Sequence, residues 1–258
     1  MPLWSARSAQ SLLAALAAAL LCTRLACAAE VRVLSAGAVE PGLRSVLAAF
    51  EQASGDHVSV SFATPTAIRE RVQSGAGFDL VITPPEVMDA LAASGQIGTD
   101  PAGRVTIGRV GIGVAVRPGA KLPDISTPEA FVRTLVDADS IVYNRASTGT
   151  YLETLLLKRL NLDLLAKTTH YADGAMVMDH VMHGTGREIG MGAITEIRLV
   201  PALQYVGPLP AALQNTTTYR AATAAAPADE AAALALLRQL GSPAAQAMFR
   251  AAGIDPAD

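Results

Sequence analysis

Small and hydroxyl-bearing residues stand at the end of the first predicted strand of this chain. The apolar run of residues 31–34 predicts a short buried strand, and Ser35, Ala36 and Gly37 follow it directly. Pro41 then suits the first turn of a helix, where its missing N–H would have no partner anyway. A helix start offers free backbone N–H groups and the positive end of the helix dipole, so this turn favours a bound anion. An ordinary connection between a strand and a helix is the alternative interpretation.

Two further turns of the same kind follow along the chain. Thr64 and Thr66 come after the alternating strand pattern of residues 57–62, and Thr83 comes after the apolar strand pattern of residues 78–82. Three strand–turn–helix units in succession predict a parallel sheet with helices packed outside it. Because ligands of such sheets bind beyond the carboxyl ends of the strands, we expect these hydroxyl groups to gather at one edge.

The alternation of strands and helices resumes in the second part of the chain. A strand over residues 140–143 and a helix over residues 151–160 are predicted on either side of a turn. That turn carries three neutral donors and one cation, namely Ser147, Thr148, Gly149 and Arg145. The Arg145 guanidinium could hold a carboxylate through two hydrogen bonds, although an arginine is more often an exposed surface residue.

The other elements follow from periodicity and from helix-start residues. Strands are predicted over residues 110–116, 168–171, 188–191, 203–206 and 215–221. Helices are predicted after Thr127, near residues 176–183, over residues 194–197 and 229–240, and from Ser242 onward. The chain is therefore predicted to be an α/β protein, and we find no internal repeat of solenoid length.

The composition is that of a globular protein, and it argues against several classes of function. Of the 258 residues, 51% are hydrophobic and 17% are charged, which is enough apolar material for one large domain or two smaller ones. The net charge of −3 and the lack of a basic block give no support for nucleic-acid binding. Aromatic residues make up only 4% of the chain, so we expect no stacking platform for bases or sugars.

The first 28 residues have the features of a cleavable export signal. Arg7 supplies the positive start, and residues 12–22 form an apolar stretch rich in Ala and Leu. Residues 26–28 then fit a small-x-small cleavage site, which makes Ala29 the expected first residue of the mature chain. The apolar stretch is too short for a typical membrane-spanning helix.

Cleavage at this site would remove both cysteines of the chain, Cys22 and Cys27. The mature protein would then contain no thiol, which excludes disulfide bonds, cysteine nucleophiles and cysteine-ligated metals. Lipid attachment at Cys27 is the less favoured alternative, because Arg24 stands where a lipoprotein signal usually has an apolar residue. An exported protein without disulfides suits a bacterial periplasm, which is the expected location.

A cluster of histidine and methionine residues raises the question of a metal site. His180 and His183 share one face of a predicted helix. Met176, Met178, Asp179 and Met182 stand beside them. Copper would accept such ligands, but no third strong ligand is near in sequence. We therefore expect the methionines to fill the core, and we expect no metal and no cofactor.

No sequence motif by itself demands catalysis. The chain has no Walker-type phosphate loop and no G-x-S-x-G elbow, and the pair Gly111 and Gly113 lacks the third glycine of a dinucleotide fingerprint. Three glutamates near predicted turns are the candidates for a catalytic base: Glu40, Glu86 and Glu196. Each of them also fits the start of a helix, where the dipole favours a carboxylate, so the catalytic residues stay unassigned.

Six short stretches, in this order along the chain, resemble a known group of proteins. They are Ser35-Ala36-Gly37-Ala38, Ser61-Phe62-Ala63-Thr64, Phe78-Asp79-Leu80-Val81-Ile82, Gly111-Ile112-Gly113-Val114-Ala115-Val116, Ser147-Thr148-Gly149-Thr150-Tyr151 and Glu188-Ile189-Gly190-Met191. The mature chain resembles, over nearly all its length, the molybdate-binding-protein-like branch of the periplasmic solute-binding proteins of ABC importers. The resemblance implies a type II, two-lobed α/β fold. Each lobe would be a mainly parallel sheet flanked by helices, with the ligand cleft between the lobes.

The resemblance also implies how the chain divides. Residues 29–110 plus 205–258 would form lobe one, and residues 111–204 would form lobe two. The chain would cross between the lobes near residues 110–116 and return near residues 203–206. Such proteins close around their ligand by a hinge motion. We expect a monomer that captures a small anionic ligand and works with an ABC permease in the inner membrane.

Carried over residue by residue, the resemblance assigns a ligand site to the turns described above. Ser35 matches the first serine that holds the oxyanion in molybdate binders, and Thr64 or Thr66 falls at the second. The expected ligand-binding set is Ser35, Ala36, Gly37, Thr64, Thr66, Thr83, Arg145, Ser147, Thr148, Gly149 and Ala193. Molybdate binders have a tyrosine near the position of Ala193, and this departure argues against molybdate as the ligand.

Some members of this branch resemble aconitate isomerase. A periplasmic isomerase that acts on a small unsaturated tricarboxylate in the same cleft is therefore the alternative function. We favour a binding protein over an enzyme, because the base candidates are all ordinary helix-start carboxylates.

Overall fold

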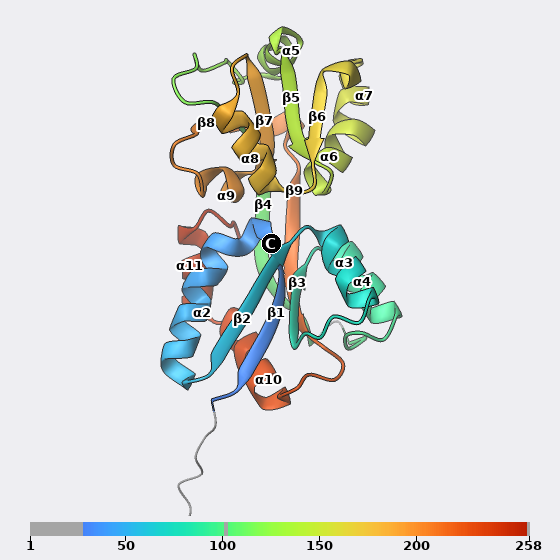
Figure 1. Ribbon diagram of the computed structural model, residues 1–258, viewed down its shortest axis with the longest axis vertical. Helices are drawn as coiled ribbons and strands as arrows, with labels where there is room; N and C mark the ends of the chain where they lie inside the picture. The colour runs from blue at the N-terminus through green and yellow to red at the C-terminus, as the bar shows by residue number, and fades with distance from the viewer. Residues whose placement is uncertain (1–27, 101–102, 257–258) are drawn as a thin grey trace, which may run out of the picture.

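The protein consists of two α/β bodies stacked along its long axis and joined by a narrow waist (Figure 1). We call the lower body in that view lobe one and the upper body lobe two. The computed structural model describes residues 28–100 and 103–256, so the predicted export signal lies outside the described residues.

Lobe one is built on a sheet with the strand order β2-β1-β3-β9-β4. Its first three strands, β1 (Glu30–Ala36), β2 (His57–Ala63) and β3 (Leu80–Thr83), are parallel, as the three strand–helix units predict. Strand β9 (Thr216–Thr223) comes from the far end of the chain and runs antiparallel between β3 and β4 (Val105–Val116). Both ends of the chain therefore complete one sheet.

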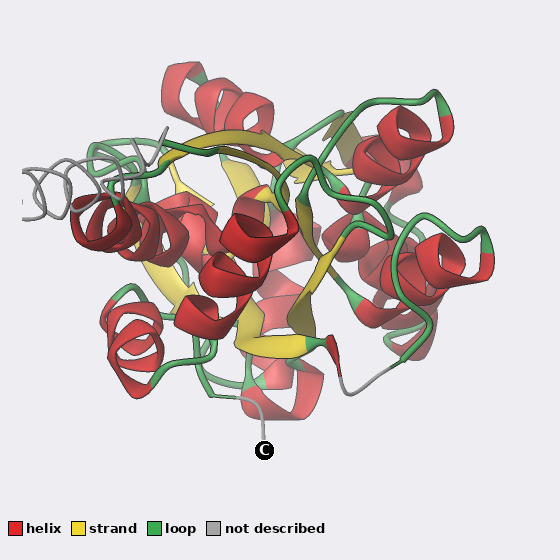
Figure 2. Ribbon diagram, turned by 90° about the horizontal axis from the view of Figure 1, so that it is seen from below, coloured by secondary structure: helices red, strands yellow, loops and turns green. Residues whose placement is uncertain are grey.

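Helices cover both faces of the lobe one sheet (Figure 2). A 3₁₀ turn, η1 (Gly37–Val39), leads into α2 (Glu40–Ser54), which packs beside α10 (Glu230–Leu240) and α11 (Pro243–Ala251). Helix α3 (Pro65–Gln73) packs beside α4 (Pro85–Ala93). The side chain of Thr64 caps α3 by accepting a hydrogen bond from the Ala67 N–H, as expected for a residue that ends a turn and starts a helix.

Lobe two has the strand order β4-β7-β5-β6, with β8 paired to β4 as well. Strand β5 (Ser140–Asn144) is parallel to β6 (Thr168–Tyr171) and β7 (Glu188–Ala193). Strands β4 and β8 (Gln204–Pro208) run antiparallel to each other, and β4 is also antiparallel to β7. The carboxyl ends of β5, β6 and β7 face lobe one, since they meet at the edge nearest the waist (Figure 1).

The helical elements of lobe two surround this sheet. They are α5 (Pro128–Asp137), α6 (Ser147–Tyr151), a π-helical turn η3 (Leu152–Leu156), α7 (Leu157–Arg159), η4 (Leu165–Lys167), α8 (Gly174–His183), α9 (Ile194–Arg198) and η5 (Ala211–Leu213). Elements α6, η3 and α7 form one continuous helical segment. Helix α5 begins as predicted, because Thr127 accepts the Ala130 N–H at 3.2 Å and Pro128 follows it.

The start of α6 differs from the prediction. The sequence predicts a turn over residues 145–150, whereas the helix already begins at Ser147 and the Thr150 N–H donates to the Ala146 carbonyl at 2.9 Å. Gly149 allows this, because a Cβ at that position would overlap the Asn144 carbonyl oxygen and press on the Tyr143 ring. The glycine that suggested a turn lets the first helical turn close onto the end of β5.

Two chain segments connect the lobes at the waist. Strand β4 pairs with β9 in lobe one up to Gly111 and with β7 and β8 in lobe two from Ile112 onward. On the return, the Gln214 side chain accepts the Ile112 N–H at 2.9 Å and donates to the Ile112 carbonyl at 3.0 Å. Since β8 pairs within lobe two, we propose that the chain returns over residues 209–216 rather than near residues 203–206.

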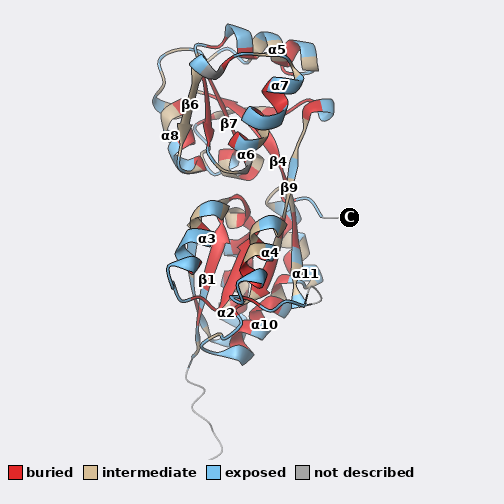
Figure 3. Cartoon of the chain, turned by 90° about the vertical axis from the view of Figure 1, so that its right-hand side faces the viewer, coloured by how far each residue is buried: buried red, intermediate tan, exposed pale blue. Residues whose placement is uncertain are grey.

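Each lobe has its own hydrophobic core. The core of lobe one combines residues between positions 31 and 110 with residues between positions 219 and 254. The cores of lobe two lie between positions 112 and 213. Buried strands with exposed helix surfaces around them are visible in both lobes (Figure 3). Within the described part of the chain, no helix is long and apolar enough to cross a membrane.

Candidate functional site

A cavity of about 430 Å³ lies between the lobes, and residues of both lobes line it. Ala36 and Ala63 end β1 and β2 on the lobe one side, and Asn144 and Ala193 end β5 and β7 on the lobe two side. Ligands of open α/β sheets bind beyond the carboxyl ends of the parallel strands. This cavity lies beyond the carboxyl ends of the parallel strands of both lobes. We call it the central cavity.

Five helix starts contribute residues to the central cavity. They are represented by Gly37 of η1, Thr64 of α3, Thr148 of α6, Asp173 of α8 and Ala193 of α9. The starts of η1 and α6 have no side-chain cap, and they come from opposite lobes. No side chain therefore competes with an anion for the first backbone N–H groups of these two starts.

Part of the predicted ligand-binding set lines the central cavity. This part consists of Ala36, Gly37, Thr64, Thr148 and Ala193. Tyr219 of β9, which is not in the predicted set, also lines the cavity. The predicted residues that line the cavity end a strand or start a helix, whereas Tyr219 lies at the waist.

The other predicted hydroxyl groups lie elsewhere. Ser35 is fully buried, and its hydroxyl donates to the Ala36 carbonyl at 3.1 Å. Successive side chains of a strand point to opposite faces of the sheet, so Ser35 and Ala36 point to opposite sides. Thr83 is fully buried too, and its hydroxyl has no hydrogen-bond partner among the described residues. Thr66 is exposed on α3 and lies outside the cavity.

The predicted cation also lies outside the central cavity. Arg145 is exposed and lines a separate hollow of about 560 Å³, together with Gly149, Glu153 and His170. The chain turns between Arg145 and Thr148, so that the cavity receives Thr148 while the arginine faces the other way. The side chain of Ser147 is not among those that the structure describes.

The central cavity contains three carboxyl groups. Glu40 comes from α2, Asp173 caps α8 by accepting the Met176 N–H at 2.9 Å, and Glu196 belongs to the first turn of α9. Two of these were base candidates from the sequence, whereas the third candidate, Glu86, is exposed outside the cavity. Sequence reasoning missed Asp173, although an Asp directly before Gly174 at the end of a strand is a typical helix cap.

Arg71 of α3 is the arginine that lines the same cavity within the described residues. Its Nη1 donates to the Ser61 hydroxyl at 2.9 Å, which holds the side chain against β2. The described lining is therefore richer in carboxyl groups than in cations.

The Glu196 carboxyl spans the gap between the two lobes. A Cβ at Gly37 of lobe one would lie 3.0 Å from its Oε1, and a Cβ at Gly174 would overlap its other oxygen. Next to it, the buried Thr195 hydroxyl donates to the Ala38 carbonyl of lobe one at 2.6 Å. Helix α9 is thus the element of lobe two that touches η1 directly.

The environment of Glu196 favours its neutral form. Burial raises the pKa of this carboxyl to about 7, the Ala193 N–H opposes the increase, and the charges of Asp173 and Glu40 add to it. A carboxyl whose pKa is raised toward neutrality is able both to accept and to donate a proton.

The histidine and methionine cluster has a different environment. His180 and His183 line an open hollow with Asp179, and the Tyr171 hydroxyl lies 2.7 Å from His180 Nδ1. Met178 is buried in the core of lobe two, as expected, whereas Met176 is exposed. The described residues contain no group of three or more side chains with the arrangement of a metal site.

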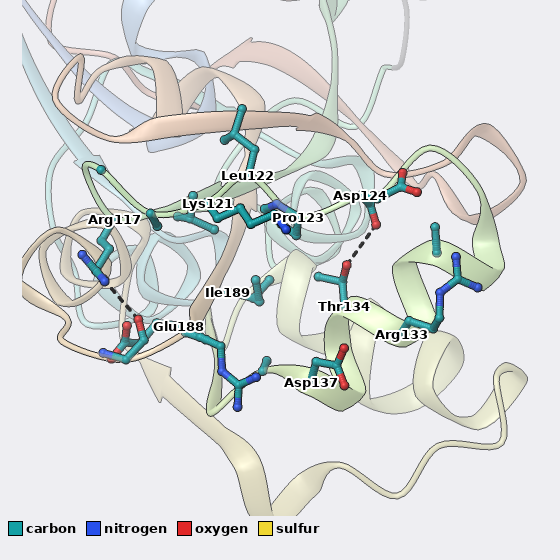
Figure 4. Close-up of a pocket in the computed structure, with 17 residues that line it drawn as sticks. Arg117, Lys121, Leu122, Pro123, Asp124, Arg133, Thr134, Asp137, Glu188 and Ile189 are labelled. Atoms are coloured by element: carbon teal, nitrogen blue, oxygen red, sulfur yellow. Dashed lines mark hydrogen bonds between the residues drawn. The ribbon is translucent and has the colours of Figure 1, made fainter.

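A further hollow of about 620 Å³ lies at the end of lobe two remote from the waist, against α5 (Figure 4). Arg117, Lys121 and Arg133 line it, but Asp124 and Asp137 are interspersed with them. It is also far from the carboxyl ends of the strands. The central cavity is therefore the candidate functional site.

Sequence comparisons connect the chain with one family and one enzyme. A family model described as bacterial extracellular solute-binding protein matches residues 31–255. A protein from a Pseudomonas species described as aconitate isomerase is 33% identical over 229 residues, which is 87% of each of the two chains.

Solved structures of anion-binding proteins have the same fold. The periplasmic molybdate-binding protein of Azotobacter vinelandii matches with a TM-score of 0.70 and 17% identity, over 88% of this chain and 100% of that chain. The sulfate-binding protein SubI of Mycobacterium tuberculosis H37Rv matches with a TM-score of 0.71 and 20% identity, over 89% of this chain and 88% of that chain. These likenesses confirm the predicted two-lobed α/β fold.

Proposed function

Because the chain belongs to the bacterial extracellular solute-binding proteins, we propose that its central cavity captures a small oxyanion or carboxylate in the periplasm. An ABC permease of the inner membrane would receive the captured anion. The observation that supports this most directly is that two uncapped helix starts, η1 of lobe one and α6 of lobe two, line the same cavity.

Capture by such a cavity follows from simple electrostatics. Fixed N–H groups replace the hydration shell of an anion without the reorganisation that water needs, and the helix dipoles add a favourable potential. Because the donors come from both lobes, the anion would hold the lobes together at the waist. The buried Thr148 in the cavity wall would add one neutral hydroxyl donor.

Calorimetry on the mature protein tests this proposal. Molybdate, tungstate, sulfate, citrate and trans-aconitate form the panel, and we expect at least one of them to bind with saturation. Thr148→Val removes a donor to a charged ligand, and should weaken binding by about tenfold or more. Thr150→Val is the matched control, because Thr150 lies on the same helix but lines the separate hollow. Absence of binding across the panel would refute the proposal.

Isomerisation of aconitate is the second candidate function. The 33% identical relative described as aconitate isomerase favours it, and so does the presence of three carboxyl groups in the cavity. The reaction breaks a C–H bond at the methylene carbon of trans-aconitate and forms a C–H bond at the vinyl carbon. The double bond, which joins the central carbon to the vinyl carbon, then joins the central carbon to the former methylene carbon. The proton taken up by a protein carboxylate returns to the substrate, so the reaction needs no oxidant and no second substrate.

One assay separates the two candidate functions. Mature protein is incubated with trans-aconitate, and the cis isomer is measured by chromatography. Steady formation of cis-aconitate that disappears in Glu196→Gln would establish the enzyme. Saturable binding of trans-aconitate without any cis product would exclude it and leave the receptor.

A further inference from the structure

We propose that Glu196 takes up a proton when the central cavity binds an anion, so that anion capture is coupled to protonation of this one carboxyl. The neutral carboxyl would donate a hydrogen bond to the ligand, and the ionised carboxylate would repel it. This inference rests on the proposed capture of an anion in the central cavity.

The position of Glu196 carries the argument. Its carboxyl lies in the wall of the cavity, where it approaches Gly37 of lobe one and Gly174 at the start of α8. An anion drawn to the uncapped N–H groups of η1 would therefore lie within reach of this carboxyl. An ionised carboxylate at that distance would cost more than a helix dipole contributes, since two like charges interact strongly in a poorly hydrated site.

The charged groups around Glu196 strengthen the coupling. Asp173 on α8 and Glu40 on α2 are both acids, and both favour a neutral Glu196. Arg44 of α2 forms a salt bridge with Glu40. On its own helix, Arg198 stacks over the Tyr205 ring of β8 with 5.2 Å between the guanidinium carbon and the ring centre.

The remaining titratable groups on the surrounding elements are engaged or face elsewhere. Arg71 of α3 lines the cavity but is hydrogen-bonded to Ser61 on β2. On α8, Asp179, His180 and His183 line a separate open hollow. Because the pKa of Glu196 without ligand is about 7, this carboxyl is able to take up a proton near neutral pH.

The direction of the pH effect follows from linkage. A bound anion stabilises the neutral form and raises the pKa of Glu196 further, so binding takes up a proton at any pH above the unliganded value. Affinity should be constant well below pH 7 and should fall by about tenfold per pH unit above it. The affinity stops falling once the pH exceeds the pKa that Glu196 has in the anion-bound protein.

Calorimetry with trans-aconitate as the probe tests the coupling. Titrations at about pH 8 in two buffers of different ionisation enthalpy give the number of protons taken up per ligand. We expect wild type to take up about one proton and Glu196→Gln to take up almost none, with an affinity that changes little above pH 7. The amide keeps the shape and the hydrogen-bond donor, so this variant should bind more tightly than wild type at high pH.

Two further variants separate proton uptake from loss of charge. Glu40→Gln removes a carboxylate from the same cavity, and should raise affinity while proton uptake persists. Glu196→Asp retains the acid, and should keep the proton uptake with weaker binding because the shorter side chain withdraws the carboxyl. Circular dichroism verifies that each variant is folded.

The outcomes distinguish this inference from the proposed function. Wild type that binds no anion at any pH would refute the capture itself and, with it, the coupling. Binding with the same proton uptake in wild type and Glu196→Gln would overturn the role of Glu196 while leaving capture in place.

Discussion

Single residues show which of the predicted site positions the fold brings to the central cavity and which it does not. Thr64 and Thr148, which the turns predict as ligand residues, line the central cavity, because side chains at a helix start tilt toward the N-terminal end of the helix. Ser35 was predicted on the same grounds but is turned into the sheet, since whether a strand-end side chain faces the cavity depends on the strand register. The raised pKa of Glu196 depends on its burial and on the charges of Asp173 and Glu40, which only the folded chain brings together.

Asp79 is the residue for which we expect the largest effect on stability. Its buried carboxylate accepts hydrogen bonds from the N–H groups of Arg32 and Ala228 and from the Arg32 guanidinium. Asp79→Ala would remove the buried acceptor of both backbone N–H groups and of the Arg32 guanidinium, and should lower the free energy of unfolding by about 3 kcal/mol. Urea denaturation followed by circular dichroism measures this. Asp56→Ala, which removes a partly exposed carboxylate, is the control and should lower the free energy of unfolding much less.

The same carboxylate gives a defined pH dependence. Burial acts to raise the pKa of Asp79, but hydrogen bonds from Arg32 and Ala228 outweigh it and hold the pKa below its ordinary value. The stabilisation is therefore fully present above the pKa of an unfolded Asp and is lost as the pH falls through the lower folded value. The difference between wild type and Asp79→Ala should shrink in acid; a difference that stays constant would contradict this account.

At the scale of elements, the order of strands and helices could be predicted almost completely from the sequence. Apolar runs of strand length and capping residues such as Thr127 mark most of the elements, because each depends only on neighbours in sequence. The start of α6 could not be predicted, since Ala146 is not a capping residue and Gly149 has the propensity of a turn. The pairing of β9 between β3 and β4 is also a tertiary property, with no local signal.

Strand β4 has a β-bulge against β9 between Thr106 and Gly108, and we expect this bulge to be sensitive to substitution. Gly108 has a φ of +149°, and a Cβ there would lie 2.5 Å from the Asp255 carbonyl oxygen and 2.7 Å from Ile254 Cγ2. Gly108→Ala should therefore cost about 2 kcal/mol or more of unfolding free energy, from backbone strain together with the clash. Chemical denaturation of the variant and wild type gives the difference.

Gly207 provides a matched control for this substitution. Its φ of +155° is similar, but the nearest neighbour of an added Cβ is Ile125 Cδ1 at 3.6 Å. Gly207→Ala should therefore show the backbone cost alone, about 1 kcal/mol. Equal losses at Gly108 and Gly207 would mean that packing of the last residues against β4 contributes nothing.

At the scale of the whole molecule, two bodies with separate cores meet mainly at the waist, where Gln214 joins the crossing segments, and at the contact of α9 with η1. This arrangement permits the lobes to rotate about the waist, and a ligand in the central cavity would favour the closed arrangement. The family resemblance predicted the two lobes; the position of the return crossing depends on strand pairing that the sequence does not reveal.

Closure is measurable by small-angle X-ray scattering. We expect the radius of gyration of the mature protein to decrease when a saturating anion is added, because both lobes contact it. Thr148→Val at the same anion concentration should show a smaller decrease in proportion to its lower occupancy. An unchanged radius of gyration in anion-saturated wild type would contradict closure.

The place of β9 in the sheet also sets the order in which the protein is able to form. Residues 80–83 of β3 are all buried, yet the strand that covers their outer edge is made only after the whole of lobe two. A nascent chain would therefore hold a complete second lobe while its first lobe still exposes an apolar, unpaired strand. Such an edge is open to pairing with other chains until β9 has docked between β3 and β4.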